Sequence, residues 1–353
     1  MEITKLQSPI SIGKLGLSNR LVMSPMLLSI ANDEGEVTQD IIDYYEARAK
    51  GGVGLIITGA AYVTDTGKLY AKTHAISDDR HVSGWRKLVR RVHSHESKIA
   101  IQLGHGGARS RSTVTGQQPA GPSSVSFTDL PETPRELSTT EIHDLVSAFG
   151  QASRRAREAG FDAIELHCSA GFLIHQFISP YSNRRKDEYG GDFANRMRFP
   201  LEIVRRVRDN VGPDLAIGCR IPHDEIVPGG LTLEDTRDIA AGLVKAGVDF
   251  VRVVVGVSPP KGRTDSQRTS TTRPEGQLPA LSHAMKQAVK VPVMATGGIT
   301  TIEQADKILR SGSADLIAAG LALLADPYWL EHSPGYIEMF PGMVYCPQCG
   351  HKV

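Results

Sequence analysis

Several features that mark other protein classes are scarce or missing in this chain. Four cysteines among 353 residues are too few for a disulfide framework and favour a reducing compartment. A formal net charge of +1 provides no overall field that would attract nucleic acid, a membrane surface or an acidic polymer. No run of about 18 apolar residues is present, so we expect no membrane-spanning helix. The amino terminus has no apolar segment flanked by basic residues, and we therefore expect a cytoplasmic protein without a signal peptide.

A further missing feature is a G-x-G-x-x-G turn after an early strand, which marks open doubly wound nucleotide-binding sheets. Short continuous apolar segments recur instead, as is typical of strands covered on both faces of a parallel sheet. These segments lie at residues 20–25, 54–60, 98–105, 163–169, 216–222, 250–257, 291–298 and 316–324.

Amphipathic segments with helix start and stop residues lie between these strands. Ser138, three residues before Glu141, predicts a capping box, and Gly160 predicts the end of the same helix. Similar segments run from Thr232 to Gly247 and from Thr300, with Glu303 as its capping partner, to Gly312. Eight strands alternating with helices predict an α/β protein, a single-domain (β/α)8 TIM barrel over residues 1–335, followed by a short cysteine-containing tail at 336–353.

In such a barrel the functional residues lie at the carboxyl ends of the strands. Residues at those ends include Ser24, Pro25, Met26, Ala60, Gln102, His105, His167, Arg220, His223, Gly297, Gly298 and Gly320. A glycine pair after a late strand, such as Gly297 and Gly298, lets backbone N–H groups approach a phosphate at a helix N-terminus. The pair suits a tight strand-to-helix turn equally well, and spacing alone does not choose between these interpretations.

Residues 175–208 carry an unusual combination of short motifs: S-P, N-R-R, D-E-Y-G-G and N-R-x-R-F-P. Further motifs follow in order along the chain: NRLVMSPM at 19–26, QLGHGGAR at 102–109, DEIVPGGLT at 224–232, TGGI at 296–299 and GLALLADP at 320–327. On these residues the chain resembles the old yellow enzyme family of FMN-dependent oxidoreductases, which includes NADH:flavin oxidoreductases and the barrel of dienoyl-CoA reductases. The resemblance covers nearly the whole chain and implies a flavoprotein.

The resemblance also implies FMN across the barrel mouth and NAD(P)H as electron donor. Gln102 would bind the pyrimidine end of the flavin, and Arg220 would place a positive charge near flavin N1 and O2, which raises the reduction potential. Glycine amides would bind the phosphate. The other residues implied at the cofactor are Ser24, Pro25, Met26, Ala60, Gly297, Gly298, Gly320 and Leu321.

The substrate side departs from the family pattern. Relatives carry a His-x-x-His or His-x-x-Asn pair that binds the carbonyl of an activated alkene, followed two residues later by a tyrosine that donates a proton. Here His167 is present, but Ala170 and Phe172 occupy the other two positions. General acid catalysis contributes about 10²–10⁴ in rate, so alkene reduction by the family mechanism would be impaired. Leu27, also expected at the substrate, stands where relatives have threonine or cysteine near flavin O4, and Leu321 replaces an arginine beside the phosphate.

Three histidines at the same rim are candidates for the missing acid or base, because imidazole titrates near neutral pH. His167 keeps the family position and is expected to bind substrate. His105 is alternatively a hydrogen-bonding residue in a glycine-rich turn, and His223 is alternatively a structural residue.

Cys346 and Cys349 form a C-x-x-C near the end of the sequence. One C-x-x-C is half of a zinc ribbon or of a [4Fe–4S] site, which usually has four thiolates. We therefore expect no bound metal unless other ligands complete the site, and interpret the pair as a free dithiol or the remnant of a cluster-binding segment.

These features predict an FMN oxidoreductase in which NAD(P)H reduces the flavin and the flavin reduces an unsaturated, enone- or enoyl-like small molecule. Two alternatives stay open: an FMN-dependent dehydrogenase or oxidase working in the oxidative direction, and a flavin-binding subunit with degraded chemistry. We expect no nucleic-acid or membrane partner. A homo-oligomer and a protein electron-transfer partner are both compatible with the sequence.

Overall fold

The computed structural model describes residues 4–125, 132–222, 224–225, 227–254 and 277–331. It contains a closed barrel of parallel strands, ordered β4-β3-β13-β12-β11-β10-β9-β6, with β6 pairing back to β4. The barrel strands are β3 (Leu21–Met23), β4 (Leu55–Ile57), β6 (Lys98–Gly104), β9 (Ala163–His167), β10 (Ala216–Pro222), β11 (Phe250–Val254), β12 (Val293–Thr296) and β13 (Leu316–Ala319). Each strand lies inside one of the predicted apolar segments, so the (β/α)8 TIM barrel is confirmed.

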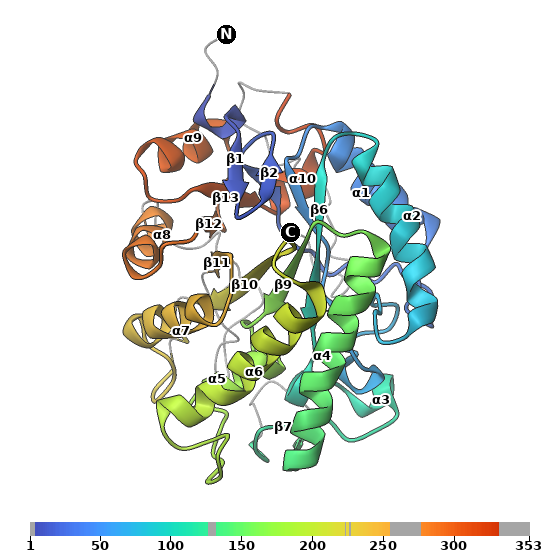
Figure 1. Ribbon diagram of the computed structural model, residues 1–353, viewed down its shortest axis with the longest axis vertical. Helices are drawn as coiled ribbons and strands as arrows, with labels where there is room; N and C mark the ends of the chain where they lie inside the picture. Colours follow the sequence, from blue (N-terminus) through green and yellow to red (C-terminus); the bar gives the residue numbers. More distant parts are fainter. Residues whose placement is uncertain (1–3, 126–131, 223, 226, 255–276, 332–353) are drawn as a thin grey trace.

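Helices surround the barrel, with α1, α2 and α4 on one side and α7, α8 and α9 on the other (Figure 1). The longer helices are α1 (Gln39–Lys50), α2 (Val82–His93), α4 (Thr139–Ala159), α6 (Phe193–Val211), α7 (Leu233–Lys245), α8 (Gln277–Ala288) and α9 (Ile302–Arg310). The shorter elements are α3 (Ser112–Thr115), α5 (Leu173–Ile178), α10 (Leu321–Ala325), β1 (Ile10–Ile12), β2 (Leu15–Leu17), β5 (Ala61–Tyr62), β7 (Ala120–Gly121) and β8 (Arg135–Glu136). Within the described ranges, no helix is long and apolar enough to cross a membrane.

Capping side chains define the ends of the surrounding helices. α4 begins after Ser138, whose hydroxyl accepts from the backbone N–H of Glu141 while the Glu141 carboxylate accepts from the N–H of Ser138. It ends at Gly160, which is left-handed at φ 94°. α7 begins after Thr232, again with a capping box. These boundaries confirm the sequence-based expectation that polar caps and glycines delimit the helices.

Two predicted boundaries are wrong. The residue that caps α9 is Thr301, paired with Gln304, rather than Thr300 with Glu303. The Gln304 side-chain oxygen accepts from the N–H groups of both Thr300 and Thr301, which places the helix start one residue later. The last apolar segment, predicted as strand through residue 324, leaves the sheet at Ala319 and continues as α10, because a continuous apolar run fits a buried strand and a buried helix equally well.

The barrel interior is apolar below the carboxyl ends of the strands. Its side chains include Val22, Leu55, Ile57, Ala100, Ala163, Ala216, Phe250, Met294, Leu316 and Ala318. Phe250 fills the space beside Gly218, where a Cβ would lie 2.0 Å from the ring. The β1–β2 hairpin packs Ile12, Leu15 and Leu17 against this cluster. The hairpin thereby closes one end of the interior and leaves the carboxyl ends of the strands for a site.

Candidate functional site

A cavity of about 170 Å³ lies at the carboxyl ends of the barrel strands. We call it the cofactor cavity. It is lined by Ser24, Pro25, Met26, Arg220, Arg252, Thr296, Gly297, Gly298, Ile299, Thr300, Ala318, Ala319, Gly320 and Leu321. Of the residues predicted to bind the cofactor, only Ala60 and Gln102 lie outside this lining. The fold therefore brings together residues from both ends of the sequence.

The turn between β12 and α9 is shaped to receive an anion. Gly297 and Gly298 have φ values of 109° and 61°, which residues with a Cβ rarely adopt. The turn leads into the first turn of α9, whose backbone N–H groups and dipole favour negative charge. Gly320, at the start of α10, brings its backbone close to the segment that follows β3, since a Cβ there would lie 3.4 Å from Met26 Sδ. This arrangement fits a phosphate group.

Two buried polar atoms at the cofactor cavity have no hydrogen-bond partner among the described residues. They are Arg220 Nε and Thr296 Oγ1. An unpaired buried polar group costs about 1–3 kcal/mol, so a ligand that bonds both atoms would remove that cost. Burial lowers the pKa of Arg220 to about 9, which leaves the guanidinium cationic at neutral pH. The cavity therefore offers a positive charge and hydrogen-bonding atoms to a polar ligand.

A second arginine, Arg252 on β11, reaches the same cavity from the barrel interior. Its Nε and Nη2 donate to the Glu165 carboxylate on β9 at 2.6 and 2.7 Å. Gln102 Nε2 on β6 donates to the same carboxylate at 2.6 Å. Sequence analysis missed Glu165 and Arg252 as site residues because both lie inside strongly apolar strand segments. A single charged residue within each segment was the feature that could have identified them.

His167 connects the cofactor cavity to the neighbouring part of the barrel mouth. Arg220 Nη1 lies 3.3 Å from His167 Nε2, and because arginine only donates, this nitrogen accepts and the ring proton lies on Nδ1. Burial, followed by the charges of Arg220 and Arg252, lowers the pKa of His167 far below its usual value. The imidazole is therefore neutral at pH 7. Its face is covered by Phe172, stacked at 3.8 Å between ring centroids with a 14° angle between planes.

An apolar cluster forms the other side of the barrel mouth, and we call it the apolar wall. It consists of Leu27, Ala60, Leu69, Tyr70, Ala170 and Phe172. The wall therefore contains three of the predicted substrate-binding residues, Leu27, Ala170 and Phe172. The fourth, His167, lies next to the wall, stacked on Phe172. Ala170 has φ 54°, an unusual conformation for a residue other than glycine, asparagine or aspartate. Leu69 and Tyr70 were not predicted, and no motif in the sequence marks them.

His105 is held by contacts on both ring nitrogens. Its Nδ1 accepts from the N–H of Gly107 at 2.9 Å, and its Nε2 lies 3.2 Å from Thr66 Oγ1. Burial lowers the pKa of His105 to about 3. A neutral imidazole with both nitrogens engaged favours the hydrogen-bonding role in the glycine-rich turn over proton transfer.

Three further predicted residues, His223, Cys346 and Cys349, lie outside the described residues. Of the other cysteines, Cys168 and Cys219 are buried free thiols. Within the described part of the chain, no group of three or more His, Cys, Asp or Glu side chains is placed to hold a metal ion.

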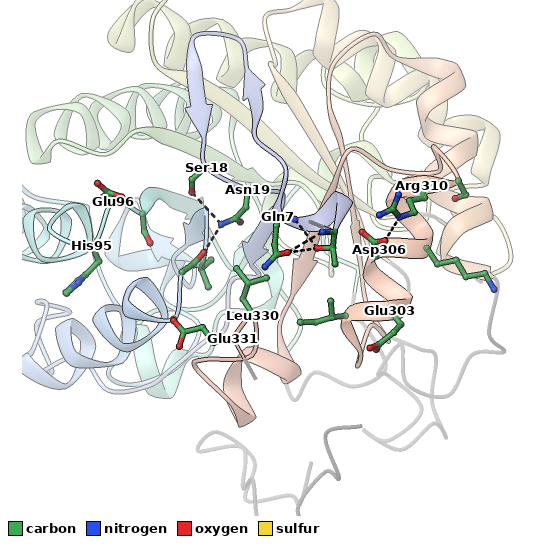
Figure 2. Close-up of a pocket in the computed structure, with 18 residues that line it drawn as sticks. Gln7, Ser18, Asn19, His95, Glu96, Glu303, Asp306, Arg310, Leu330 and Glu331 are labelled. Carbon is green, nitrogen blue, oxygen red and sulfur yellow. Dashed lines mark hydrogen bonds and ion pairs between the residues drawn. The ribbon is translucent and has the colours of Figure 1, made fainter. Parts of the chain in front are cut away.

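A larger cavity, of about 1270 Å³, lies near the amino-terminal ends of β3, β4 and β6 (Figure 2). It is lined by Thr4, Gln7, Ser18, Asn19, Gly51, Gly52, Val53, His95, Glu96, Ser97, Ile302, Glu303, Asp306, Lys307, Arg310, Ser311, Leu330 and Glu331. Arg310 is paired with Asp306 there. None of the predicted site residues lines this cavity, and neither do the described buried polar atoms that lack a partner. We therefore place the functional site at the smaller cofactor cavity.

The chain is similar to known proteins over nearly its whole length. The sequence profile of the NADH:flavin oxidoreductase / NADH oxidase family matches residues 5–334. The chain belongs to this family. It is 44% identical to an NADH oxidase of Thermoanaerobacter brockii over 90% of this chain and 49% of that protein. It is 39% identical to an NADPH dehydrogenase of Geobacillus sp. (strain WCH70) over 92% of each chain.

Solved structures show the same relationship. The old yellow enzyme homologue from Zymomonas mobilis aligns with a TM-score of 0.81 at 28% identity, over 94% of each chain. A 2-naphthoyl-CoA reductase complex aligns with a TM-score of 0.87 at 27% identity, over 92% of this chain and 51% of that one. The chain thus spans about half the length of the NADH oxidase and of the 2-naphthoyl-CoA reductase.

FMN and NAD(P)H are the cofactor and electron donor of this family, and the lining of the cofactor cavity suits the polar groups of FMN. The positive-φ glycine turn suits its phosphate, and the unpaired Arg220 Nε and Thr296 Oγ1 provide partners for its polar groups. Leu321 offers no charge at this part of the cavity, so backbone amides would have to hold a phosphate there.

Proposed function

We propose that this chain is an FMN-dependent NAD(P)H oxidoreductase whose electron acceptor is an apolar, unsaturated small molecule that binds against the apolar wall. The observation that carries this proposal is the direct junction, through His167, between the cofactor cavity and the apolar wall. Bound FMN supplies hydride transfer between the electron donor and the acceptor.

At the cofactor cavity, residues of the chain bind FMN and polarise its ring. The amides around Gly297, Gly298 and Gly320 hold the phosphate, and Arg220 holds the polar edge of the ring with a positive charge that favours reduction. Gln102 donates from its amide nitrogen to Glu165, so its amide oxygen would be the atom that accepts from the cofactor. These contacts place the cofactor in one orientation before either substrate arrives.

On the apolar wall, the side chains exclude water and shape the space for a flat molecule. Phe172 has no proton to donate and Ala170 has no hydrogen-bonding group. The neutral His167 holds Arg220 and contributes its other ring nitrogen, Nδ1, which lies 3.5 Å from Ser169 Oγ. The acceptor therefore takes its proton from water or from the Tyr70 hydroxyl, the phenol that the wall contains, and not from Ala170 or Phe172.

A second candidate is reduction of molecular oxygen, favoured by the same Phe172. Oxygen needs no proton donor fixed above the flavin, and one similar protein is named an NADH oxidase. The two candidates differ in which oxidant accepts electrons from the reduced protein: an unsaturated small molecule or molecular oxygen.

Anaerobic stopped-flow mixing of FMN-loaded protein with NADH or NADPH, followed by a second mixing step, tests both candidates. We expect bleaching of the flavin absorbance by at least one donor, then reoxidation by 2-cyclohexenone or a larger aromatic enone. Reoxidation by oxygen alone would support the second candidate instead. Absence of bleaching with both donors would contradict the proposed function.

A further inference from the structure

Glu165, Arg252 and Gln102 form a polar cluster at the top of the barrel interior. Their side chains are 0%, 1% and 1% exposed. Gln102 and Glu165 are opposite one another on the neighbouring strands β6 and β9. Arg252 comes from β11, across β10, where Gly218 is paired with Glu165 and Arg220 is paired with Arg252. The sheet register therefore builds the cluster.

A buried ion pair is by itself weak evidence for a stabilising role. Replacing a buried ion pair with apolar side chains is often neutral or stabilising, whereas removing one partner costs about 3–5 kcal/mol. The interior below the cluster is apolar, so an apolar layer would also fit here. What distinguishes the position is that Arg252 lines the cofactor cavity.

Two positive charges meet at this cavity. Arg220 and Arg252 are paired residues on β10 and β11, and among the described lining residues they are the charged ones. Besides burial, which has the largest effect, Arg252 lowers the pKa of Arg220, and Glu165 raises it. Glu165 thus offsets part of the charge that the two arginines direct at the cavity.

We propose that Glu165 is a positioning residue: it holds Arg252 at the cofactor cavity and offsets its charge, so that FMN meets one net positive charge instead of two. This inference rests on the FMN binding proposed above. A cation near the flavin ring favours the reduced, negatively charged form. Glu165 therefore sets the ratio of the affinities for reduced and oxidised FMN, which is measured as the reduction potential of the bound flavin.

The test compares Glu165→Gln, Glu165→Asp and the double variant Glu165→Gln with Arg252→Gln. A matched control is Asp249→Asn, which removes a carboxylate at the opposite ends of β10 and β11, where Asp249 accepts from Arg208 and from the N–H of Ile217. For each protein we would measure the melting temperature, the dissociation constant of oxidised FMN and the reduction potential of the bound flavin.

For Glu165→Gln we expect a more positive potential, equivalent to an increase on the order of tenfold in the preference for reduced FMN. Glu165→Asp keeps the negative charge, so we expect its reduction potential to lie close to that of the wild type. The double variant, which removes both charges, also returns toward wild type. Asp249→Asn lowers the melting temperature without moving the potential.

A role in folding alone predicts a different pattern. Melting temperatures would then fall in all variants, while the flavin reduction potential of Glu165→Gln would equal that of Asp249→Asn. This result would overturn the inference. If instead the wild-type protein takes up no FMN, the proposed function fails, and the inference fails with it. If the wild type binds FMN but the Glu165 variants have the same flavin reduction potential as the wild type, the proposed function stands and only the role of Glu165 is overturned.

Discussion

The cofactor cavity and the apolar wall are in contact through His167, yet they differ in their chemistry. The cavity has two arginines, a glycine turn and unpaired polar atoms. The wall consists mainly of aliphatic and aromatic carbon, including Ala170 and Phe172. The comparison teaches that the groups suited to bind and polarise a flavin lie on one side of His167, while the surface on its other side is apolar apart from the Tyr70 hydroxyl. The cofactor cavity and the apolar wall can be altered separately. Changes in the cavity should affect FMN binding and its reduction potential, and changes in the wall should affect reoxidation by the acceptor.

The largest expected effect comes from Arg220→Met, which acts on the cofactor cavity. Loss of a buried charged donor, with Nε otherwise unpaired, should weaken FMN binding on the order of 100-fold and shift the flavin potential to more negative values. Fluorescence titration with FMN measures the affinity. Arg310→Met, at the opposite cavity, is the control and should leave FMN binding unchanged. Equal affinities for both variants would mean that Arg220 does not face the cofactor.

Phe172→Tyr acts on the apolar wall and should give the next largest effect. It adds a phenolic proton at the edge of the ring that stacks on His167, and we expect the rate of flavin reoxidation by 2-cyclohexenone to rise on the order of tenfold. Flavin reduction by NAD(P)H, measured in the same stopped-flow experiment, is the internal control and should not change. If enone reoxidation stays at the wild-type rate, the missing phenol is not what limits this acceptor.

A smaller effect is expected from Ala170→Asn on the same wall. Asparagine tolerates the left-handed conformation that Ala170 adopts, so the free energy of unfolding should rise by about 0.5 kcal/mol. The added amide should lower KM for an enone roughly twofold to tenfold, with kcat unchanged. Ala170→Val is the matched control, and its β-branched side chain should destabilise the protein. A rise in kcat with Ala170→Asn would show that carbonyl binding and proton delivery are not separate functions.

The same contrast explains how much the sequence could predict. The cofactor half depends on backbone turns and on residues at strand ends, so Gly297, Gly298 and Arg220 could be located from motifs and strand order. Glu165 and Arg252 could not be assigned to the site, because only the register of β9, β10 and β11 shows that they meet. The substitutions at Ala170 and Phe172 were visible in the sequence. The neutral His167 that accepts from Arg220 beneath the Phe172 ring could not be predicted, because these contacts are visible only in the structure.

The smallest expected effect is the pH dependence of reoxidation by the enone, which should vary less than about twofold between about pH 6 and about pH 8. His167 has a pKa far below its usual value, and burial lowers the pKa of His105 to about 3, so neither imidazole changes charge in that interval. Stability should behave differently. These histidines stay unprotonated in the folded protein while the unfolded chain binds protons below about pH 6.5. The free energy of unfolding should therefore decrease as the pH falls from about 6.5, measurable by chemical denaturation. A sigmoidal rate profile with a midpoint near pH 6.5 that disappears in His167→Gln would instead show that His167 exchanges a proton during turnover and acts as an acid beside the apolar wall.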